Sequence, residues 1–180
     1  MPKPPPKSAD AADAHPKTAL NEAADTSVHR AYVGLGANLG DALATLRQAI
    51  QDLQAHSKVL GLRASSFYAS APVEADGPDF VNAVVELDTT LSPYGLLAAL
   101  QLMEHSAGRQ RPYLNAPRTL DLDVLLYDDL HMSDPSLTIP HPRMRQRAFV
   151  LRPLQELAPD RVSAVQLAAV DSQRVDKMRC

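Results

Sequence analysis

Two aspartates, one residue apart, lie in the segment "PRTLDLDVLLY" (117–127), whose apolar residues otherwise follow the pattern of a buried strand. Because side chains alternate along a strand, Asp121 and Asp123 point to the same face. Adjacent carboxylates repel each other, and burying either one without a partner is costly. A bound cation relieves both problems, and Mg²⁺ typically takes one or two carboxylates together with substrate phosphates. The alternative is an exposed strand face on which both aspartates are merely solvated.

Arginines surround this aspartate pair. Lys is absent between Glu104 and Pro153, where every residue of the Lys or Arg type is an arginine. These residues are Arg109, Arg111, Arg118, Arg143, Arg145, Arg147 and Arg152. Arginine binds phosphate oxygens in a planar, two-pronged geometry, so arginines around two carboxylates in a Pro-rich region favour a site for magnesium and a polyphosphate. Solvated surface arginines are the simpler alternative for any single one.

Two further motifs bear on chemistry. His141 lies between two prolines in "TIPHPRM", which stiffen the backbone and present the imidazole in a defined direction, although a lone histidine is most often structural. The segment "GLGANLG" (34–40) has neither phosphate-loop nor dinucleotide-binding glycine spacing. We therefore interpret it as a Gly-rich strand exit, with Asn38 and Asp41 helping to start the next helix.

The elements that must position these residues follow from hydrophobic periodicity and from helix-start signals. Strands are expected at 31–35, 59–70, 80–91 and 119–127, helices at 41–57 and 92–108, and a short closing helix at about 150–159. The short loop between the second and third strands favours antiparallel pairing. The order β-α-β-β-α-β predicts an α/β (α+β) protein with a ferredoxin-like core, in which a mostly antiparallel sheet carries its helices on one face.

Composition sets the domain boundaries and limits the classes of partner. The chain has 180 residues, 45% of them hydrophobic, which is enough for one core. Residues 1–29 predict a disordered tail, 30–170 the domain, and 171–180 a frayed C-terminal tail. The net charge of −3 predicts no nucleic-acid or membrane partner. With Cys180 as the only cysteine and no apolar leader, we expect a cytoplasmic protein.

With these residues assembled, the sequence resembles the 6-hydroxymethyl-7,8-dihydropterin pyrophosphokinase family of folate biosynthesis. The resemblance covers about residues 31–159 and does not depend on a single motif. It rests on five segments in the family's order and at about its spacing: "YVGLGANLGD", "SSFYASAPVE…GPDFVNAV", "LLAALQLMEHSAGRQR", "PRTLDLDVLLY" and "LTIPHPRMRQRAFVLRPLQELAP". The family's ferredoxin-like α/β fold agrees with the order of elements expected from periodicity.

The resemblance implies an enzyme that transfers pyrophosphate from ATP to the hydroxymethyl group of the pterin and releases AMP. It implies ATP as co-substrate and two Mg²⁺ ions held by Asp121 and Asp123, which would explain the paired carboxylates. On the nucleotide and phosphate side it implicates Gln101, Glu104, Arg109, Arg111, Arg118, Thr138, His141 and Arg147, with Arg109, Arg118 and Arg147 among the catalytic residues. On the pterin side it implicates Ser70, Ala71, Val73, Phe80, Asn82 and Phe149.

Two Gly- and Pro-containing segments, 71–79 and 108–117, match the family's mobile loops, which close over the substrates. The second departs from the family, because Leu114, Asn115 and Ala116 replace an arginine, a tryptophan and a glycine. This departure raises the alternative of an inactive or repurposed relative. A ferredoxin-like RNA-binding module is a second alternative, disfavoured by 4% aromatic residues. A domain that uses the two carboxylates for a structural ion is a third.

Overall fold

The computed structural model describes residues 27–72, 77–108 and 119–179. Its strands are β1 (His29–Ala37), β2 (Val59–Ala64), β3 (Tyr68–Ser70), β4 (Phe80–Thr89), β5 (Asp121–Tyr127), β6 (Met132–Ser133), β7 (Thr138–Ile139) and β8 (Val175–Lys177). Its helices are α1 (Ala42–Ala55), α2 (Pro93–Ser106), α3 (Ala148–Leu157) and α4 (Ala164–Ala169), with 3₁₀ turns η1 (Met144–Gln146) and η2 (Pro159–Arg161). Over these ranges, no helix is long and apolar enough to span a bilayer.

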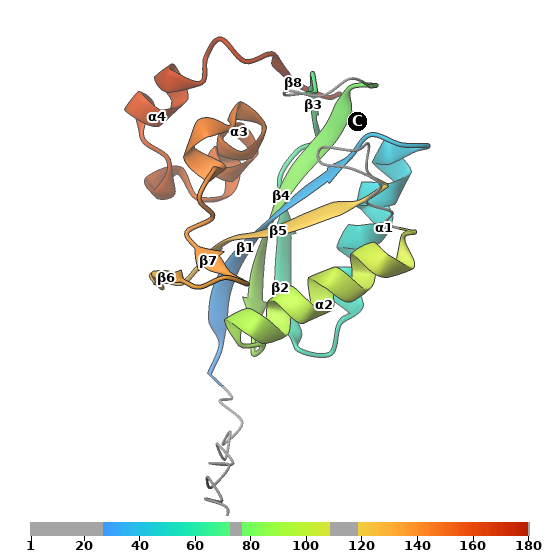
Figure 1. Ribbon diagram of the computed structural model, residues 1–180, viewed down its shortest axis with the longest axis vertical. Coiled ribbons are helices and arrows are strands. Elements are labelled where there is room, and N and C mark those ends of the chain that lie inside the picture. The colour runs from blue at the N-terminus through green and yellow to red at the C-terminus, as the bar shows by residue number, and fades with distance from the viewer. Residues whose placement is uncertain (1–26, 73–76, 109–118, 180) are drawn as a thin grey trace, which may run out of the picture.

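The main sheet has the strand order expected for a split β-α-β arrangement. Within the described ranges it runs β5-β1-β4-β3-β8, and β2 also pairs with β4. Every pairing in it is antiparallel. Helix α1 leads from β1 to β2 and thereby skips the position that β4 fills (Figure 1). The predicted ferredoxin-like β-α-β-β-α-β core is confirmed.

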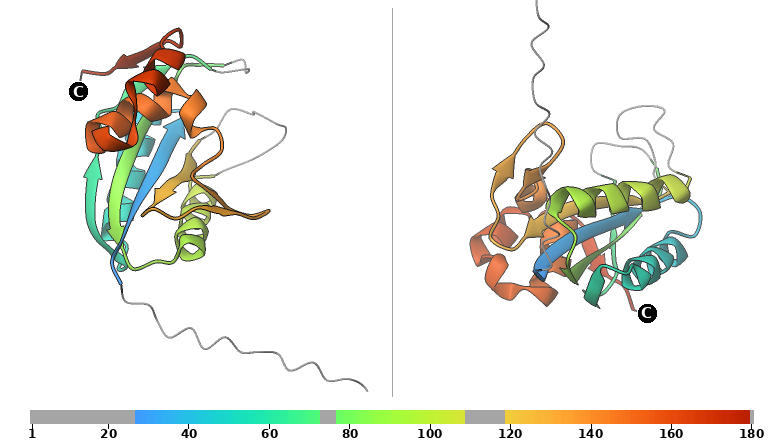
Figure 2. Two further views of the ribbon diagram at one scale, coloured as in Figure 1. Left: turned by 90° about the vertical axis from the view of Figure 1, so that its left-hand side faces the viewer. Right: turned by 90° about the horizontal axis from the view of Figure 1, so that it is seen from below.

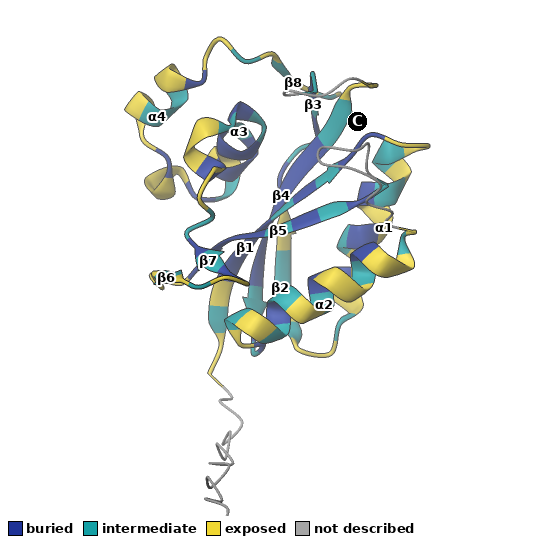
Figure 3. Ribbon diagram, in the orientation of Figure 1, coloured by how far each residue is buried: buried dark blue, intermediate teal, exposed yellow. Residues whose placement is uncertain are grey.

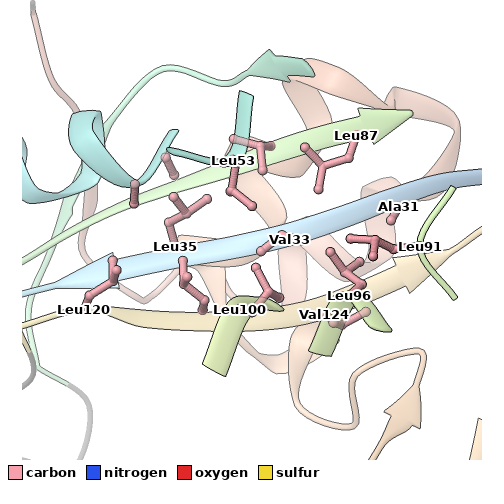
Figure 4. Packing of buried hydrophobic residues seen from close by; sticks show 14 of the residues in the cluster. Ala31, Val33, Leu35, Leu53, Leu87, Leu91, Leu96, Leu100, Leu120 and Val124 are labelled. Carbon is pink, nitrogen blue, oxygen red and sulfur yellow. The ribbon is translucent and has the colours of Figure 1, made fainter. Parts of the chain in front are cut away.

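Helices cover the two faces of the sheet differently. Helices α1 and α2 lie on one face and α3 on the other, as the two further views make clear (Figure 2). The α1/α2 face holds the larger core, which includes Val33 and Leu35 of β1, Leu53 of α1 and Leu100 of α2 (Figure 4). The burial colours follow this arrangement, with buried positions concentrated along the central strands (Figure 3). On the α3 face, the part of the sheet that α3 does not cover is available for a binding site.

Both long helices begin as their sequences predict. The Ser92 hydroxyl accepts a hydrogen bond from the Gly95 N–H at 3.1 Å, with Pro93 in the first turn. Asp41 caps α1 by accepting from the Ala44 N–H at 2.9 Å. Asn38 differs from expectation, because its side chain instead donates to the Pro78 carbonyl at 3.3 Å. It therefore ties the exit of β1 to the loop before β4.

Two parts of the chain differ from the sequence-based expectation. The strand expected at 59–70 is divided into β2 and β3, because the Ser65 hydroxyl takes the Val84 N–H at 3.0 Å and interrupts the regular pairing. The C-terminal segment, expected to fray, contains β8, which pairs with β3 (Figure 1). Tyr68 lies opposite Lys177 in that pairing, and Ser70 lies opposite Val175.

Candidate active site

A row of paired residues crosses the sheet and joins the two halves of the candidate site. Asp121 of β5 pairs with Gly36 of β1, Gly36 pairs with Asn82 of β4, and Asn82 pairs with Tyr68 of β3. Directly paired residues point to the same face of a sheet, which here is the α3 face. Asp123 lies on the same face, opposite Gly34. The register therefore places the aspartate pair and Asn82 on one surface, separated only by a glycine.

Three chemically active side chains meet at the end of this surface. The His141 Nε2 atom lies 3.8 Å from the Asp123 Oδ2 atom. The Arg147 guanidinium approaches the same oxygen to 3.9 Å. Because β5 supplies the aspartate while the β7–α3 region supplies the histidine and the arginine, the fold gathers residues far apart in sequence. The result is one carboxylate flanked by an imidazole and a guanidinium.

His141 is held as a neutral donor. Its Nδ1 atom accepts the Arg143 N–H at 3.2 Å, so the ring proton resides on Nε2, which faces Asp123. Burial lowers the pKa of His141, and this outweighs the opposite effect of the Asp123 carboxylate, while Arg147 and Arg143 lower it further. The imidazole is therefore uncharged at neutral pH and presents an N–H to the site.

A pocket of about 250 Å³ adjoins this cluster on the side away from Asn82. Thr138 and His141, for which the resemblance implied nucleotide contacts, line it together with Leu97, Leu137 and Ser136. Its outer wall is shaped by Asp134, whose Oδ1 atom accepts hydrogen bonds from the Ser136 N–H and hydroxyl and from the Leu137 N–H. Those hydrogen bonds, Ser136 first, lower the pKa of Asp134.

The two α2 residues expected at the nucleotide differ in position. Gln101 is exposed, one turn after the pocket residue Leu97. Glu104 is only 2% exposed, and its carboxylate accepts the Leu122 N–H at 2.8 Å. Leu122 lies between the two aspartates, so Glu104 anchors their strand to α2. This contact supports β5, and the ATP contact that the resemblance implied for Glu104 stays a prediction.

Residues that the resemblance assigns to the pterin side gather around Asn82. This side chain is 4% exposed and donates to the Ser70 hydroxyl at 2.9 Å and to the Tyr68 carbonyl at 3.4 Å. Its Oδ1 atom faces Gly36, where an added Cβ would lie 3.4 Å from Oδ1 and 4.0 Å from the ring of Phe80. Because the amide donates toward β3, it presents an acceptor toward the open surface above Gly36.

Phe149 and Ala71 complete the described part of the pterin side. Phe149, on the first turn of α3, is half-buried, and the Arg147 guanidinium carbon lies 5.5 Å from the centre of its ring. Ala71 is half-buried directly after β3. Val73, Arg109, Arg111 and Arg118 lie outside the described residues, as do parts of both expected loops, including the departure at 114–116.

Sequence reasoning missed several residues that shape the site. Gly36 was interpreted only as part of a strand exit, although a glycine inside a strand often marks close approach of a ligand. Leu97, Asp134 and Leu137 form the pocket next to His141 and carried no separate motif. The support by Glu104 depends on tertiary contact between α2 and β5, which one-dimensional spacing does not reveal.

Comparisons with known proteins agree on one family. Residues 32–159 match the model of the family described as 7,8-dihydro-6-hydroxymethylpterin-pyrophosphokinase (HPPK). Curated relatives named 2-amino-4-hydroxy-6-hydroxymethyldihydropteridine pyrophosphokinase include one from Methylorubrum extorquens, 43% identical over 74% of this chain and 85% of the relative. Another, from Synechocystis, is 45% identical over 73% of this chain and 68% of the relative.

Solved structures agree on the fold. A chain of Plasmodium falciparum HPPK-DHPS A437G, crystallised with SDX-DHP, superposes with a TM-score of 0.61 at 14% identity and covers 83% of this chain. A second, of the same variant with pteroate, gives a TM-score of 0.56 at 14% identity over 73% of this chain. The present chain spans 46% and 38% of those two solved chains. At this identity the likeness concerns the fold alone.

Proposed function

We propose, since the chain belongs to the 7,8-dihydro-6-hydroxymethylpterin-pyrophosphokinase family, that it transfers pyrophosphate from ATP to the hydroxymethyl group of 6-hydroxymethyl-7,8-dihydropterin. The observation that carries the proposal is the in-register row from Asp121 through Gly36 to Asn82. It places a dicarboxylate suited to phosphate chemistry beside a buried amide suited to an N–H-bearing heterocycle. The two substrates would meet above Gly36.

The aspartate pair fits magnesium in its donor chemistry. Both side chains offer hard carboxylate oxygens, and the Asp123 side chain is 39% exposed and therefore accessible. Among the described residues there is no group of three or more His, Cys, Asp or Glu side chains that could hold a metal ion. Asp121 and Asp123 would thus hold Mg²⁺ jointly with phosphate oxygens and water. Bound there, Mg²⁺ supplies neutralisation of the charge on the polyphosphate.

The chain's own residues position the reactants. The 250 Å³ pocket lined by Leu97, Leu137 and Thr138 is suited to the nucleoside end of ATP, and the polyphosphate would then extend toward Asp123. The His141 Nε2–H would donate to a phosphate oxygen, and Arg147 would neutralise charge on the transferred group. Because His141 is neutral, it donates a hydrogen bond without competing with Mg²⁺ for the aspartates.

The pterin would lie on the opposite side of the aspartate pair. The Asn82 Oδ1 atom would accept an N–H of the ring, and Phe149 would cover its face. In the reaction the hydroxymethyl oxygen bonds to the β-phosphorus of ATP, and the bond from that phosphorus to the α,β-bridging oxygen breaks. AMP leaves, and the proton of the hydroxyl passes to water. Positioning and charge neutralisation account for the rate, as is usual in phosphoryl transfer.

The test is product analysis after mixing the protein with ATP, Mg²⁺ and the pterin. Pterin-dependent AMP is the expected result. ADP as product would mean attack at the γ-phosphorus and would contradict the arrangement. An absence of product from a folded protein would favour the repurposed relative. Chelation of the divalent ion should abolish AMP formation, and full activity in chelator would refute the role assigned to the aspartate pair.

A further inference from the structure

The segment after α4 leads from α3 to the edge of the sheet, where it pairs with β3. It is called here the C-terminal strap (residues 171–178), and it lies beyond the end of the family match at residue 159. Asp171 pairs with Arg152 of α3 at 3.0 Å, and the Met178 N–H donates to the Phe67 carbonyl at 2.9 Å. Between these two anchors the strap forms β8 along β3 (Figure 2).

Gln173, in the strap, makes two hydrogen bonds that enclose one residue of the site. Its Oε1 atom accepts the Ala148 N–H at 2.9 Å. Its Nε2 atom donates to the Gln146 carbonyl at 2.8 Å. These two groups belong to the peptide planes on either side of Arg147. One side-chain amide therefore holds both planes that set the backbone direction of Arg147.

The start of α3 needs such a partner. Arg147 is the N-cap residue of this helix, and its own side chain makes no capping hydrogen bond. The arginine side chain has no acceptor to offer, so it cannot satisfy the Ala148 N–H at the start of the helix. Gln173 supplies the missing acceptor to Ala148 from a distant part of the chain. The same side chain also donates a hydrogen bond to the Gln146 carbonyl, at the end of η1.

The position of Arg147 matters because its side chain contributes to two parts of the site. Its guanidinium lies 3.9 Å from the Asp123 carboxylate and 5.5 Å from the centre of the Phe149 ring. Phe149 follows two residues later on the first turn of α3, so a rotation of this turn moves both side chains. The two hydrogen bonds of Gln173, called here the Gln173 clamp, therefore bear on the positions of both the Arg147 guanidinium and the Phe149 ring.

Neighbouring contacts keep the strap in register. Lys177 donates to the Glu156 carboxylate of α3 at 2.7 Å, and this carboxylate also accepts the Tyr68 hydroxyl at 2.6 Å. Val175 lies opposite Ser70 in the β3–β8 pairing. Arg174 contacts Asp79, just before β4. The strap is thus fixed to α3, β3 and the loop that precedes Phe80, all of which border the pterin side.

We propose that Gln173 is a positioning residue for the pyrophosphoryl transfer, acting by holding Arg147 and, through α3, Phe149; this inference rests on the proposed function. It also extends the working domain through β8. Loss of the Gln173 side-chain amide should leave the 250 Å³ pocket proposed for the nucleoside end of ATP unaffected, since that pocket is built from α2, β5 and the segment 134–142. The effect should therefore fall on kcat and on the KM for the pterin, with little change in the KM for ATP.

The first test compares Gln173→Ala with Gln155→Ala, the same deletion at an exposed position of α3. We expect Gln173→Ala to lower kcat/KM for the pterin by about tenfold to a hundredfold, the scale of a misplacement of about 1 Å in a site. The Gln155→Ala variant should match the wild type within about twofold, the scatter usual for surface substitutions. Equal activity of both variants would overturn the proposal.

Coupling to Arg147 separates positioning from a general structural effect. In an Arg147→Ala background, Gln173→Ala should cost clearly less than in the wild type, because the part of its effect that acts through the Arg147 side chain is gone and only the part through Phe149 remains. The same loss in both backgrounds would overturn the proposal. Gln173→Glu keeps the acceptor but loses the donor, so its activity relative to wild type should rise as lower pH protonates the carboxyl. A pH-independent ratio would contradict the clamp.

Amide exchange gives a readout that does not depend on catalysis. In the wild type, the Ala148 N–H should exchange slowly because Gln173 covers it, and in Gln173→Ala it should exchange much faster. The Leu151 N–H, which donates to the Arg147 carbonyl at 3.0 Å, serves as the internal reference. Fast exchange of Ala148 in the wild type would refute the clamp itself. A wild type that protects Ala148 but forms no AMP would instead refute the proposed function.

Discussion

The substitution Gly36→Ala should weaken pterin binding while leaving the stability of the fold nearly unchanged. The backbone of Gly36 is not among the described positions with a positive φ, so alanine is sterically allowed in the strand. The added Cβ would lie 3.4 Å from the Asn82 Oδ1 atom and 4.0 Å from the Phe80 ring, both ordinary contacts. The free energy of unfolding should therefore change by less than about 1 kcal/mol.

Pterin binding should respond much more strongly. The new methyl group occupies the surface between Asp121 and Asn82, where the proposed reaction brings the hydroxymethyl group of the pterin. Forcing a methyl group into a filled contact costs about 1–3 kcal/mol. This corresponds to a rise in the pterin Kd of roughly fivefold to 150-fold. The pocket beside Thr138 is not touched, so the Kd for ATP should remain within about twofold of the wild type.

The assay is titration calorimetry with each ligand, together with thermal unfolding. Gly61→Ala is the matched control, because it makes the same change in β2 at the far end of the sheet. The three atoms nearest to its Cβ all belong to the Asp88 side chain, and the closest is a carboxylate oxygen at 3.3 Å. An unchanged pterin Kd in Gly36→Ala would refute our account of where the substrates meet. Equal weakening of ATP and pterin binding would mean that the strand itself had been distorted.

Asp121→Ala or Asp123→Ala should abolish turnover and leave thermal unfolding nearly unchanged, because each relieves repulsion between carboxylates; wild-type turnover in either variant would refute the metal assignment. Asn82→Ala should weaken pterin binding about tenfold or more and ATP binding much less, since it removes a buried hydrogen-bonding group; calorimetry that finds equal losses would refute the pterin assignment. Although desolvation raises the pKa of Glu156, hydrogen bonds from its neighbours, including Lys177, lower it from 4.5 to about 2. Its stabilising contribution should therefore be present above pH 4.5 and be lost as the pH falls toward 2, and Glu156→Gln should lack this part of the pH dependence in urea unfolding; parallel curves for the two proteins would contradict it.

The order of elements and the placement of the aspartate pair on one strand face could be predicted from the sequence, because both follow from local patterns. Ser92 and Pro93 mark a helix start in any context, and the alternation around Asp121 and Asp123 places both carboxylates on one face. The resemblance added the pairing of Asn82 with the pterin side. These features depend on periodicity, on capping and on family motifs, all of which can be recognised in short segments of the sequence.

The remaining features depend on contacts between distant segments. β8 is three residues long, and its sequence "VDK" has no apolar alternation, so only its partner β3 makes it a strand. Glu104 has the sequence context of any helical acid, and its burial follows from the Leu122 N–H above it. Gln173 is one polar residue in a polar tail, and its two hydrogen bonds appear only once α3 is in place.

The central claim is that one face of the sheet brings a nucleotide's polyphosphate and a pterin together for transfer of an intact pyrophosphoryl group. Mass spectrometry of the pterin product, formed with ATP and Mg²⁺, tests it most directly. We predict a product that carries two phosphoryl groups, formed in step with AMP and absent when Asp123→Ala replaces the wild type. A product that carries a single phosphoryl group, or an unmodified pterin beside hydrolysed ATP, would contradict the account.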